Sequence, residues 1–196
     1  MASKDRSKIG RNNRNKGNML ERITADTLSE WIYGRTKVLR RTPLSGGWSG
    51  SKMGDVTVDP EFQRKGVFVP SIYVECRNYR GILQHNFFTW VCYAKPKELS
   101  LWIKEVEAKC DGRLPMLVLK GKSTKPWVLF MNRWLDSRQY VALTKLDSYI
   151  MFVQHRHLGI VVPLKSMGSV GRAEWFFGEK ISAHTPHIKG ARRSDP

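Results

Sequence analysis

The chain has 196 residues, enough for one ordinary domain, and 41% of them are hydrophobic, enough for a buried core. Its 34 Lys and Arg against 17 Asp and Glu give a formal net charge of +17, which indicates a polyanionic partner, nucleic acid first. No run approaches the roughly 18 apolar residues of a membrane-spanning helix, and the basic N-terminal segment lacks the apolar stretch of a secretory signal, so we expect a soluble cytoplasmic protein with no membrane partner.

The cysteines and histidines do not form a zinc-binding pattern. Cys76, Cys92 and Cys110 lie far apart without a C-x-x-C pair, so we expect them to pack as small hydrophobic side chains with reduced thiols. His155 and His157 are two residues apart, but no cysteine or acid beside them completes a set of zinc ligands.

The N-terminal part of the chain predicts a basic arm followed by a helix. Residues 1–17 contain six Lys or Arg and three Asn without apolar periodicity, which is typical of a flexible arm. Over residues 18–33 apolar positions recur near helical spacing, so we expect an amphipathic helix that ends at Gly34. The apolar positions are Met19, Leu20, Ile23, Leu28, Trp31 and Ile32.

Aliphatic and β-branched segments follow the helix. They predict strands at 37–41, at 54–58, and at 67–69 continued by 71–76. A glycine- and serine-rich loop at 42–51 separates the first two strands, and Asp59-Pro60 is expected to turn the second toward the third. The second and third strands together predict a hairpin with a long basic tip.

The second half of the chain alternates between helical and strand patterns. A helix is predicted over 98–110, because Leu99, Trp102, Ile103 and Val106 share one face. The other expected elements are strands at 114–119, 127–131 and 140–143, a short helix at 146–153, an apolar segment at 160–162, an aromatic segment at 175–177 and a loose tail from 184. This order predicts an α/β fold with a mixed sheet and helices on its faces.

Two carboxylates and a backbone carbonyl suggest a metal site. Asp55 begins one predicted strand and Glu75 ends the next, so a hairpin would bring both acids to one edge of the sheet. Strand alternation places Tyr73, Glu75 and Arg77 on one face and the aliphatic neighbours on the other. Mg²⁺ prefers oxygen ligands, often two carboxylates with a carbonyl and waters, and the carbonyl of Cys76 is adjacent. The set predicts a Mg²⁺ site, with Mn²⁺ as the alternative, that activates water for phosphodiester hydrolysis.

Each acid also has an ordinary structural explanation. Glu21 near the start of a helix is a favourable partner of the helix dipole, and Asp55 after a glycine is common in turns. Glu75 in a buried strand would be costly without a partner, and Arg77 or Arg80 could be that partner.

The order of these motifs resembles the PD-(D/E)xK nuclease superfamily, and within it the archaeal-type Holliday junction resolvases that some phages also carry. Lys16-Gly17 followed by Glu21-Arg22 is similar to the family's opening K-G-x-x-x-E-R. Residues 41–50 are similar to its serine-glycine loop.

The later motifs follow in the same family order. Gly54-Asp55-Val56 is similar to the segment that carries the metal aspartate, and Val74–Arg77 occupies the place of the E-x-K strand. The later helix and the segments 117–120 and 127–130 come next, so the resemblance spans about residues 16 to 130.

The resemblance implies a restriction-endonuclease-like fold, a mixed central β-sheet flanked by helices. It divides the chain into a flexible basic arm (1–17), a nuclease domain (18–153) and a C-terminal extension with a loose tail (154–196). The catalytic residues that it implies are Glu21, Asp55, Glu75 and Arg77, and the metal-binding residues are Asp55, Glu75, Cys76 and Glu21.

Two features of this chain depart from the family pattern. Arg77 stands where the family has lysine, and an arginine stays protonated in proteins, so it can stabilise phosphate charge but cannot take a proton from water. A mechanism with metal-bound hydroxide is compatible with arginine, whereas a lysine-base mechanism is not. The interval from Asp55 to Glu75 is also long for a hairpin, and the tip at 63–66 would absorb the extra residues.

Basic and serine residues around these motifs predict contacts with DNA phosphates. Arg35 and Lys37 with the following arginine pair form a stripe for backbone contact, and a basic turn at 120–125 follows a strand near the acids. That turn contains Gly-Lys-Ser, but Met116 stands where a phosphate-binding loop requires glycine, so an ATPase is excluded. The expected nucleic-acid contacts are Lys16, Arg22, Arg40, Arg41, Ser45, Ser49, Lys52, Arg80, Lys120 and Lys122.

The combined prediction is a Mg²⁺-dependent endodeoxyribonuclease that hydrolyses phosphodiester bonds in branched DNA, such as a four-way junction. We expect a homodimer, because a junction needs two symmetric cuts, and phage origin would place it in the cytoplasm of a bacterial host. Two alternatives stay open: a non-catalytic nucleic-acid-binding protein on a nuclease-like fold, and a general nuclease of the same superfamily that acts on duplex ends.

Overall fold

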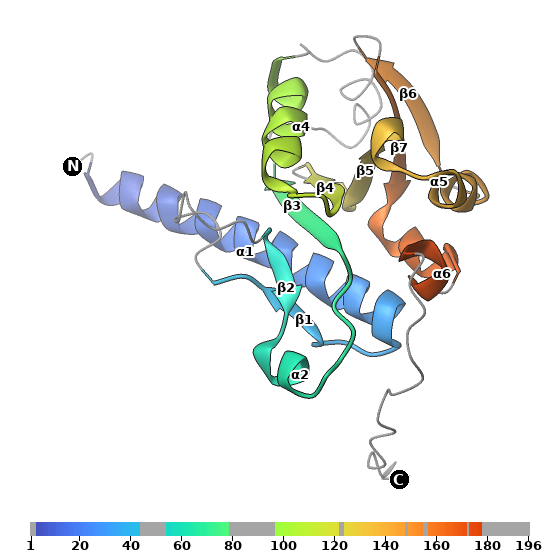
Figure 1. Ribbon diagram of the computed structural model, residues 1–196. Coiled ribbons are helices and arrows are strands. Elements are labelled where there is room, and N and C mark those ends of the chain that lie inside the picture. The colour runs from blue at the N-terminus through green and yellow to red at the C-terminus, as the bar shows by residue number, and fades with distance from the viewer. Residues whose placement is uncertain are drawn as a thin grey trace, which may run out of the picture.

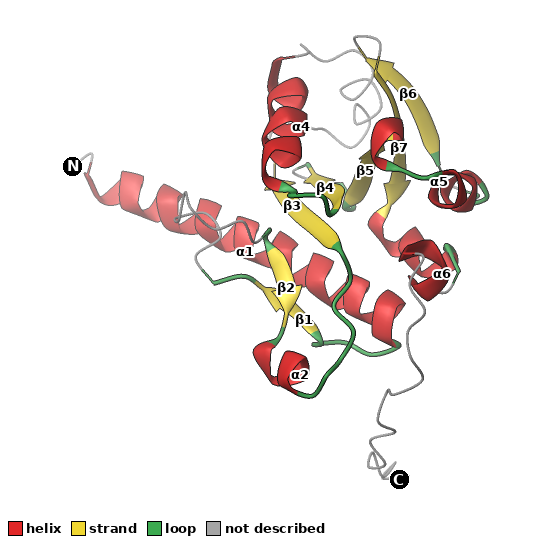
Figure 2. Ribbon diagram, viewed as in Figure 1, coloured by secondary structure: helices red, strands yellow, loops and turns green. Residues whose placement is uncertain are grey.

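A mixed five-stranded sheet with helices on both faces forms the body of the computed structural model (Figures 1 and 2). The structure describes residues 3–43, 54–78, 97–121, 124–147, 149–154, 157–171 and 173–177. In spatial order the strands are β3 (Ile72–Asn78), β4 (Leu114–Lys120), β5 (Trp127–Met131), β7 (His157–Pro163) and β6 (Ile150–Gln154). Only β3 and β4 are parallel among these neighbours, and β3 lies at one edge of the sheet.

The remaining elements surround this sheet. β1 (Leu39–Arg41) and β2 (Val56–Val58) form a separate antiparallel ladder. The helices are α1 (Ser3–Tyr33), α2 (Pro60–Arg64), α4 (Lys97–Lys109), α5 (Ser137–Thr144) and α6 (Ala173–Phe177), with 3-10 turns η2 (Asn132–Trp134) and η3 (Leu164–Ser169).

Two hydrophobic cores hold the layers together, one on each face of the sheet. On one face Val74, Val118 and their neighbours pack with α1, the small ladder, α5 and α6. On the other face Tyr73 and Leu117 pack with the apolar side of α4. Strands buried on both faces are typical of the parallel part of an α/β sheet. The predicted mixed sheet with flanking helices is confirmed.

Helix α1 is longer than the sequence pattern indicated. The segment expected as a flexible arm is helical from Ser3 onward and continues into the amphipathic part (Figure 1). Lys and Arg are good helix formers, and no proline interrupts the segment, so the packed part can propagate toward the N-terminus. The predicted end at Gly34 is confirmed, with φ +67° and an N–H that donates to the carbonyl of Glu30. No helix in the described ranges is both long and apolar enough to cross a membrane.

The predicted hairpin of 54–58 with 67–76 is wrong. β2 pairs with β1, whereas β3 pairs in parallel with β4. The intervening residues do not turn at Asp59-Pro60 but begin α2 there: the Asp59 side chain accepts the N–H of Glu61, and proline occupies the first turn. The segment 67–69 is not a strand. The sequence pattern correctly located the strands β2 and β3, but it did not indicate the strands with which they pair.

After β5, one predicted strand is a helix in the structure and one predicted helix is a strand. The expected strand at 140–143 lies in α5, because Asp136 and Gln139 form a capping box that starts a helix at Ser137. The expected helix at 146–153 is instead β6, paired with β7. Its aromatic and β-branched residues favour a strand once a partner is present. The predicted helix at 98–110 and strands at 114–119 and 127–131 are confirmed.

Candidate active site

The edge strand β3 presents an acid and a cation toward α4. Tyr73 belongs to the core on the α4 side and Val74 to the core on the α1 side, so the predicted alternation is confirmed. The Arg77 guanidinium contacts Glu105 of α4 and lies 6.0 Å from the ring of Trp102. The same guanidinium is 3.0 Å from Glu75 Oε1.

Asp55 is held against the same strand by two hydrogen bonds, one from its backbone and one to its side chain. Its N–H donates to the carbonyl of Val74 at 2.7 Å, and its Oδ2 accepts the N–H of Cys76 at 2.7 Å. These bonds lie on either side of Glu75. The hairpin was wrong, but the two carboxylates still meet at one edge of the sheet, because the chain before β2 lies against β3.

Gly54 allows this close approach of the two backbones. A Cβ there would lie 2.9 Å from the Val74 nitrogen and closer still to its carbonyl oxygen. On the other side, Thr42 donates from its side chain to the Gly54 carbonyl at 2.6 Å and from its N–H to the Asp55 carbonyl at 2.8 Å. The Gly-Asp pair is thus held between the end of β1 and the middle of β3.

Glu21 approaches Asp55 from α1. Its carboxylate forms an ion pair with the guanidinium of Arg41, the last residue of β1, and its side chain is 13% exposed. One turn further along α1, Thr24 accepts a long 3.6 Å contact from the thiol of Cys76. Glu21 is therefore on the α1 side of β3, whereas Glu75 faces α4.

The acids of the site perturb one another. Burial raises the pKa of Glu75, the negative charge of Asp55 raises it further, and Arg77 and Lys109 oppose the shift. Burial and Asp55 raise the pKa of Glu21 in the same way, against the effect of Arg41. Burial and the charge of Asp55 also raise the pKa of the Cys76 thiol, so the thiol stays protonated. A cation between these acids would relieve their repulsion.

Glu21 and Glu75 each interact electrostatically with Asp55, but the described residues do not bring the three acids into one metal-binding cluster. Within the residues that the structure describes, no three His, Cys, Asp or Glu side chains form a group that could hold a metal ion. The physical reason is that Glu21 and Glu75 lie on opposite sides of β3, with Asp55 at the edge between them. The donors that suit a hard divalent cation are Asp55, Glu75 and the Cys76 carbonyl, all oxygen atoms at one strand edge.

Glu105 is a contact that the sequence analysis missed. Glu105 lies on α4, and its carboxylate pairs with the Arg77 guanidinium. The same guanidinium pairs with Glu75, so the three side chains form one ion network. Among the described atoms the Arg77 Nε is buried without a hydrogen-bond partner. Its position three residues after Trp102 places Glu105 beside the apolar face of the predicted helix. No neighbouring residue in the sequence indicates that it pairs with Arg77.

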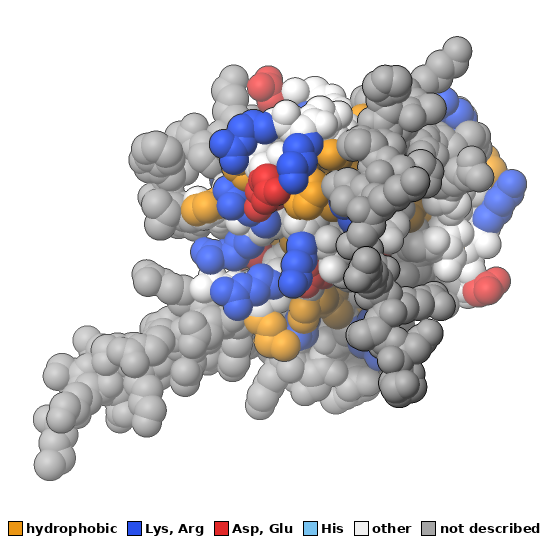
Figure 3. All heavy atoms as spheres, turned by 90° about the horizontal axis from the view of Figure 1, so that it is seen from below, with side chains coloured by type: hydrophobic (Ala, Val, Ile, Leu, Met, Phe, Trp, Pro, Cys, Tyr) orange, Lys and Arg blue, Asp and Glu red, His pale blue; other side chains and the backbone are white. Residues whose placement is uncertain are grey.

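Three of the predicted DNA contacts gather in one place. Arg22, Arg40 and Arg41 line a common groove on α1 and β1, and Figure 3 shows a face on which Lys and Arg side chains gather. Lys120 ends β4 opposite Asn78, one residue past Arg77 on the neighbouring strand. The side chain of Lys16 lies outside the described part, as do Ser45, Ser49, Lys52, Arg80 and Lys122.

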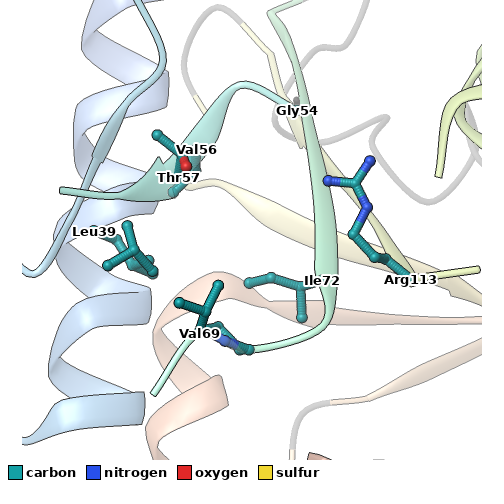
Figure 4. A pocket seen from close by; sticks show the side chains of 9 residues that line it. Leu39, Gly54, Val56, Thr57, Val69, Ile72 and Arg113 are labelled. Atoms are coloured by element: carbon teal, nitrogen blue, oxygen red, sulfur yellow. The ribbon is translucent and has the colours of Figure 1, made fainter. Parts of the chain in front are cut away.

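A second cavity lies beside Gly54 and is too small for a ligand. It has a volume of about 90 Å³, against roughly 300–1,000 Å³ for typical ligand pockets, and Arg113 is the one charged residue of its lining (Figure 4). The other lining residues are Leu39, Gly54, Val56, Thr57, Val58, Val69, Pro70 and Ile72. We interpret this cavity as a packing gap.

A mixed sheet whose edge strand carries an acid and a cation beside Asp55 is the arrangement expected of the PD-(D/E)xK nuclease superfamily. The chain belongs to the family described as "Phage putative PDDEXK endonuclease", whose profile matches residues 12–157, more than half of the chain. The chain has no match among the curated proteins or the solved structures compared with it. The superfamily inferred from the motifs is confirmed by this membership.

The raised pKa of Glu75 predicts how stability changes with pH. A carboxyl whose folded-state pKa is above its unfolded value contributes stability that is fully present below the unfolded pKa and is lost as pH rises through the folded one. In EDTA, we expect Glu75→Gln to become progressively more stable relative to wild type as the pH rises above the usual glutamate pKa of about 4.3. Urea unfolding at each pH measures the difference. A flat difference in stability between Glu75→Gln and wild type across this pH range would contradict the prediction.

Proposed function

We propose that this chain is a divalent-metal-dependent DNA endonuclease that uses Asp55 and Glu75, with Mg²⁺ as the expected ion and Mn²⁺ as the alternative. The observation that supports this most is the attachment of Asp55 to β3 on both sides of Glu75. This attachment places the Asp55 carboxylate beside the strand that carries Glu75, and the chain belongs to a phage endonuclease family.

The ligands of the proposed ion are Asp55, Glu75 and the carbonyl of Cys76, and Glu21 would support it through Asp55. When bound by these residues, a divalent ion would supply water activation and would stabilise the negative charge of the phosphate. Hydrolysis joins the water oxygen to phosphorus, breaks one P–O ester bond and delivers a proton to the leaving oxygen.

Arg77 has an electrostatic part in this proposal. Its guanidinium lies next to Glu75 and remains protonated, so it can hold a phosphate oxygen but cannot accept the proton of water. Glu105 positions the guanidinium from α4.

The proposed substrate is branched DNA, and the proposed assembly is a homodimer. The test is cleavage of a fluorescent four-way junction and of a linear duplex of the same sequence, each with Mg²⁺ or Mn²⁺. We expect cutting of both to require the ion and the junction to be cut faster, with paired nicks on opposing strands. Equal rates on the two substrates would favour a general nuclease. Light scattering of the protein with and without the junction checks the dimer.

One observation favours the non-catalytic alternative. Arg41 pairs with Glu21 and Arg77 with Glu75, and such ion pairs are a sufficient structural reason to retain a buried acid. In that case the chain would bind DNA and never cut it with either metal ion.

A further inference from the structure

A groove lined by cations lies next to the acids on the α1 side. It has a volume of about 440 Å³ and carries four cations against two acids. Its lining residues are Arg22, Ala25, Asp26, Lys37, Leu39, Arg40, Arg41 and Asp59. The excess of positive charge in a concave surface favours a polyanion with regularly spaced charges.

Arg41 connects this groove to the proposed active site. It lines the groove and at the same time forms the ion pair with Glu21 of α1. Its side chain is 29% exposed, so an incoming ligand can reach it. The neighbouring Arg40 pairs with Asp59 at 3.4 Å and is 43% exposed. Among the cations that line the groove, Arg41 is therefore the one that pairs with Glu21.

We propose that the groove binds phosphates of the nucleic-acid backbone and that Glu21 competes with those phosphates for Arg41. The inference rests on the proposed function for the identity of the polyanion as DNA. A phosphodiester offers the guanidinium the same pair of oxygen acceptors as a carboxylate does. When Arg41 turns to a phosphate, Glu21 loses its partner while Asp55 remains beside it, and the negative charge of the site rises.

This competition couples DNA binding to metal binding. A site with more negative charge attracts a divalent cation more strongly. Bound DNA would therefore raise the affinity of the acids for the ion. Since coupling between two ligands is reciprocal, the ion would also tighten DNA binding by the same factor. The ion pair between Arg41 and Glu21 would keep the charge of Glu21 neutralised in the absence of DNA.

The test is a double-mutant cycle on metal-free DNA binding. The full chain is titrated into a fluorescein-labelled duplex in EDTA, and anisotropy gives the Kd for wild type, Glu21→Gln, Arg41→Gln and the double variant. We expect Glu21→Gln to lower the Kd about threefold or more, because it releases Arg41, and to have little effect when Arg41→Gln is also present. If Glu21→Gln tightens binding equally in both backgrounds, the competition is wrong.

A matched control separates this effect from a simple change of charge. Asp26→Asn removes one negative charge from the same groove, and its effect on Kd should not depend on whether Arg41 is present. The logarithm of the DNA association constant falls linearly with the logarithm of the salt concentration. Arg22→Gln should make this negative slope shallower by about 0.9, the value for one phosphate contact, whereas Arg138→Gln on α5 should leave it unchanged. An unchanged slope for Arg22→Gln and Arg40→Gln would overturn the groove as the phosphate site.

A measurement on wild type covers the case in which Glu21→Gln fails to fold. NMR of the arginine Nε–Hε groups in EDTA follows Arg41 with and without the duplex. Because the Arg41 Nε–H donates to Glu21, its signal should shift when Arg41 turns to a phosphate, whereas the signal of Arg138 on α5 should not, and an unshifted Arg41 signal would contradict the competition. All these experiments omit metal, so a chain that binds in this way but never cuts would refute the proposed function and leave this inference intact.

Discussion

Asp55→Asn and Glu75→Gln should each reduce metal-dependent DNA cutting by about 10²–10³-fold, a loss of about 3–4 kcal/mol in transition-state stabilisation. Both changes keep the shape of the side chain and remove its negative charge. An asparagine oxygen can still accept the N–H of Cys76, so Asp55 would stay in place while the site loses a ligand for the cation. Initial rates of junction cleavage at saturating Mg²⁺ measure the effect.

Binding and a pair of distant acids provide the controls for this prediction. Both variants should bind DNA in EDTA at least as tightly as wild type, because each removes a negative charge near a polyanion. Asp147→Asn after α5 and Glu61→Gln on α2 should cut at the wild-type rate. Wild-type cutting by either site variant would remove that acid from the proposed site.

Arg77 variants distinguish a role in charge stabilisation from one in proton transfer. Arg77→Lys retains the positive charge and should cut within about tenfold of wild type, whereas Arg77→Ala should lose about 10²-fold. The pH profile of Arg77→Lys would also acquire a dependence on the protonation of the new amine if it served as a base. Equal loss in both variants would indicate that the guanidinium geometry, and not its charge, is required.

Gly54→Ala should be the most damaging single-methyl change in the described part of the site. The added carbon would meet the backbone of Val74, which cannot rotate away as a side chain could, so we expect a loss of about 3 kcal/mol in the free energy of unfolding. Urea unfolding measures the loss. If the fold persists, the displaced Asp55 should also lose activity.

Gly168→Ala is the matched control for the glycine substitution. Nothing lies within 4 Å of a Cβ at Gly168, so its free energy of unfolding should stay within about 0.5 kcal/mol of wild type. If Gly54→Ala were as stable as Gly168→Ala, the close approach of Asp55 to β3 would not be a constraint on this fold.

Particular residues show how far the candidate site could be predicted. Asp55 and Glu75 stood out because each acid borders a strand-like run, and alternation placed Arg77 beside Glu75. Their proximity is found in the structure, although by a different route from the one expected. Glu105 and the partner of Glu21 could not be found, because each contact joins segments 20 or more residues apart.

The sequence by itself determined which faces the residues of β3 present, where α1 ends and which acids were candidates, because periodicity and glycine conformation are local properties. Only the tertiary structure decided that β2 pairs with β1, that β3 pairs with β4, and that Glu21 and Glu75 approach Asp55 from opposite sides. Strand pairing depends on which distant segments bury their hydrophobic side chains together. Two strands with the same sequence pattern can therefore pair with different strands. The resulting pairing leaves the three candidate acids outside a single cluster in the described residues, and it places Arg41 between Glu21 and the basic groove.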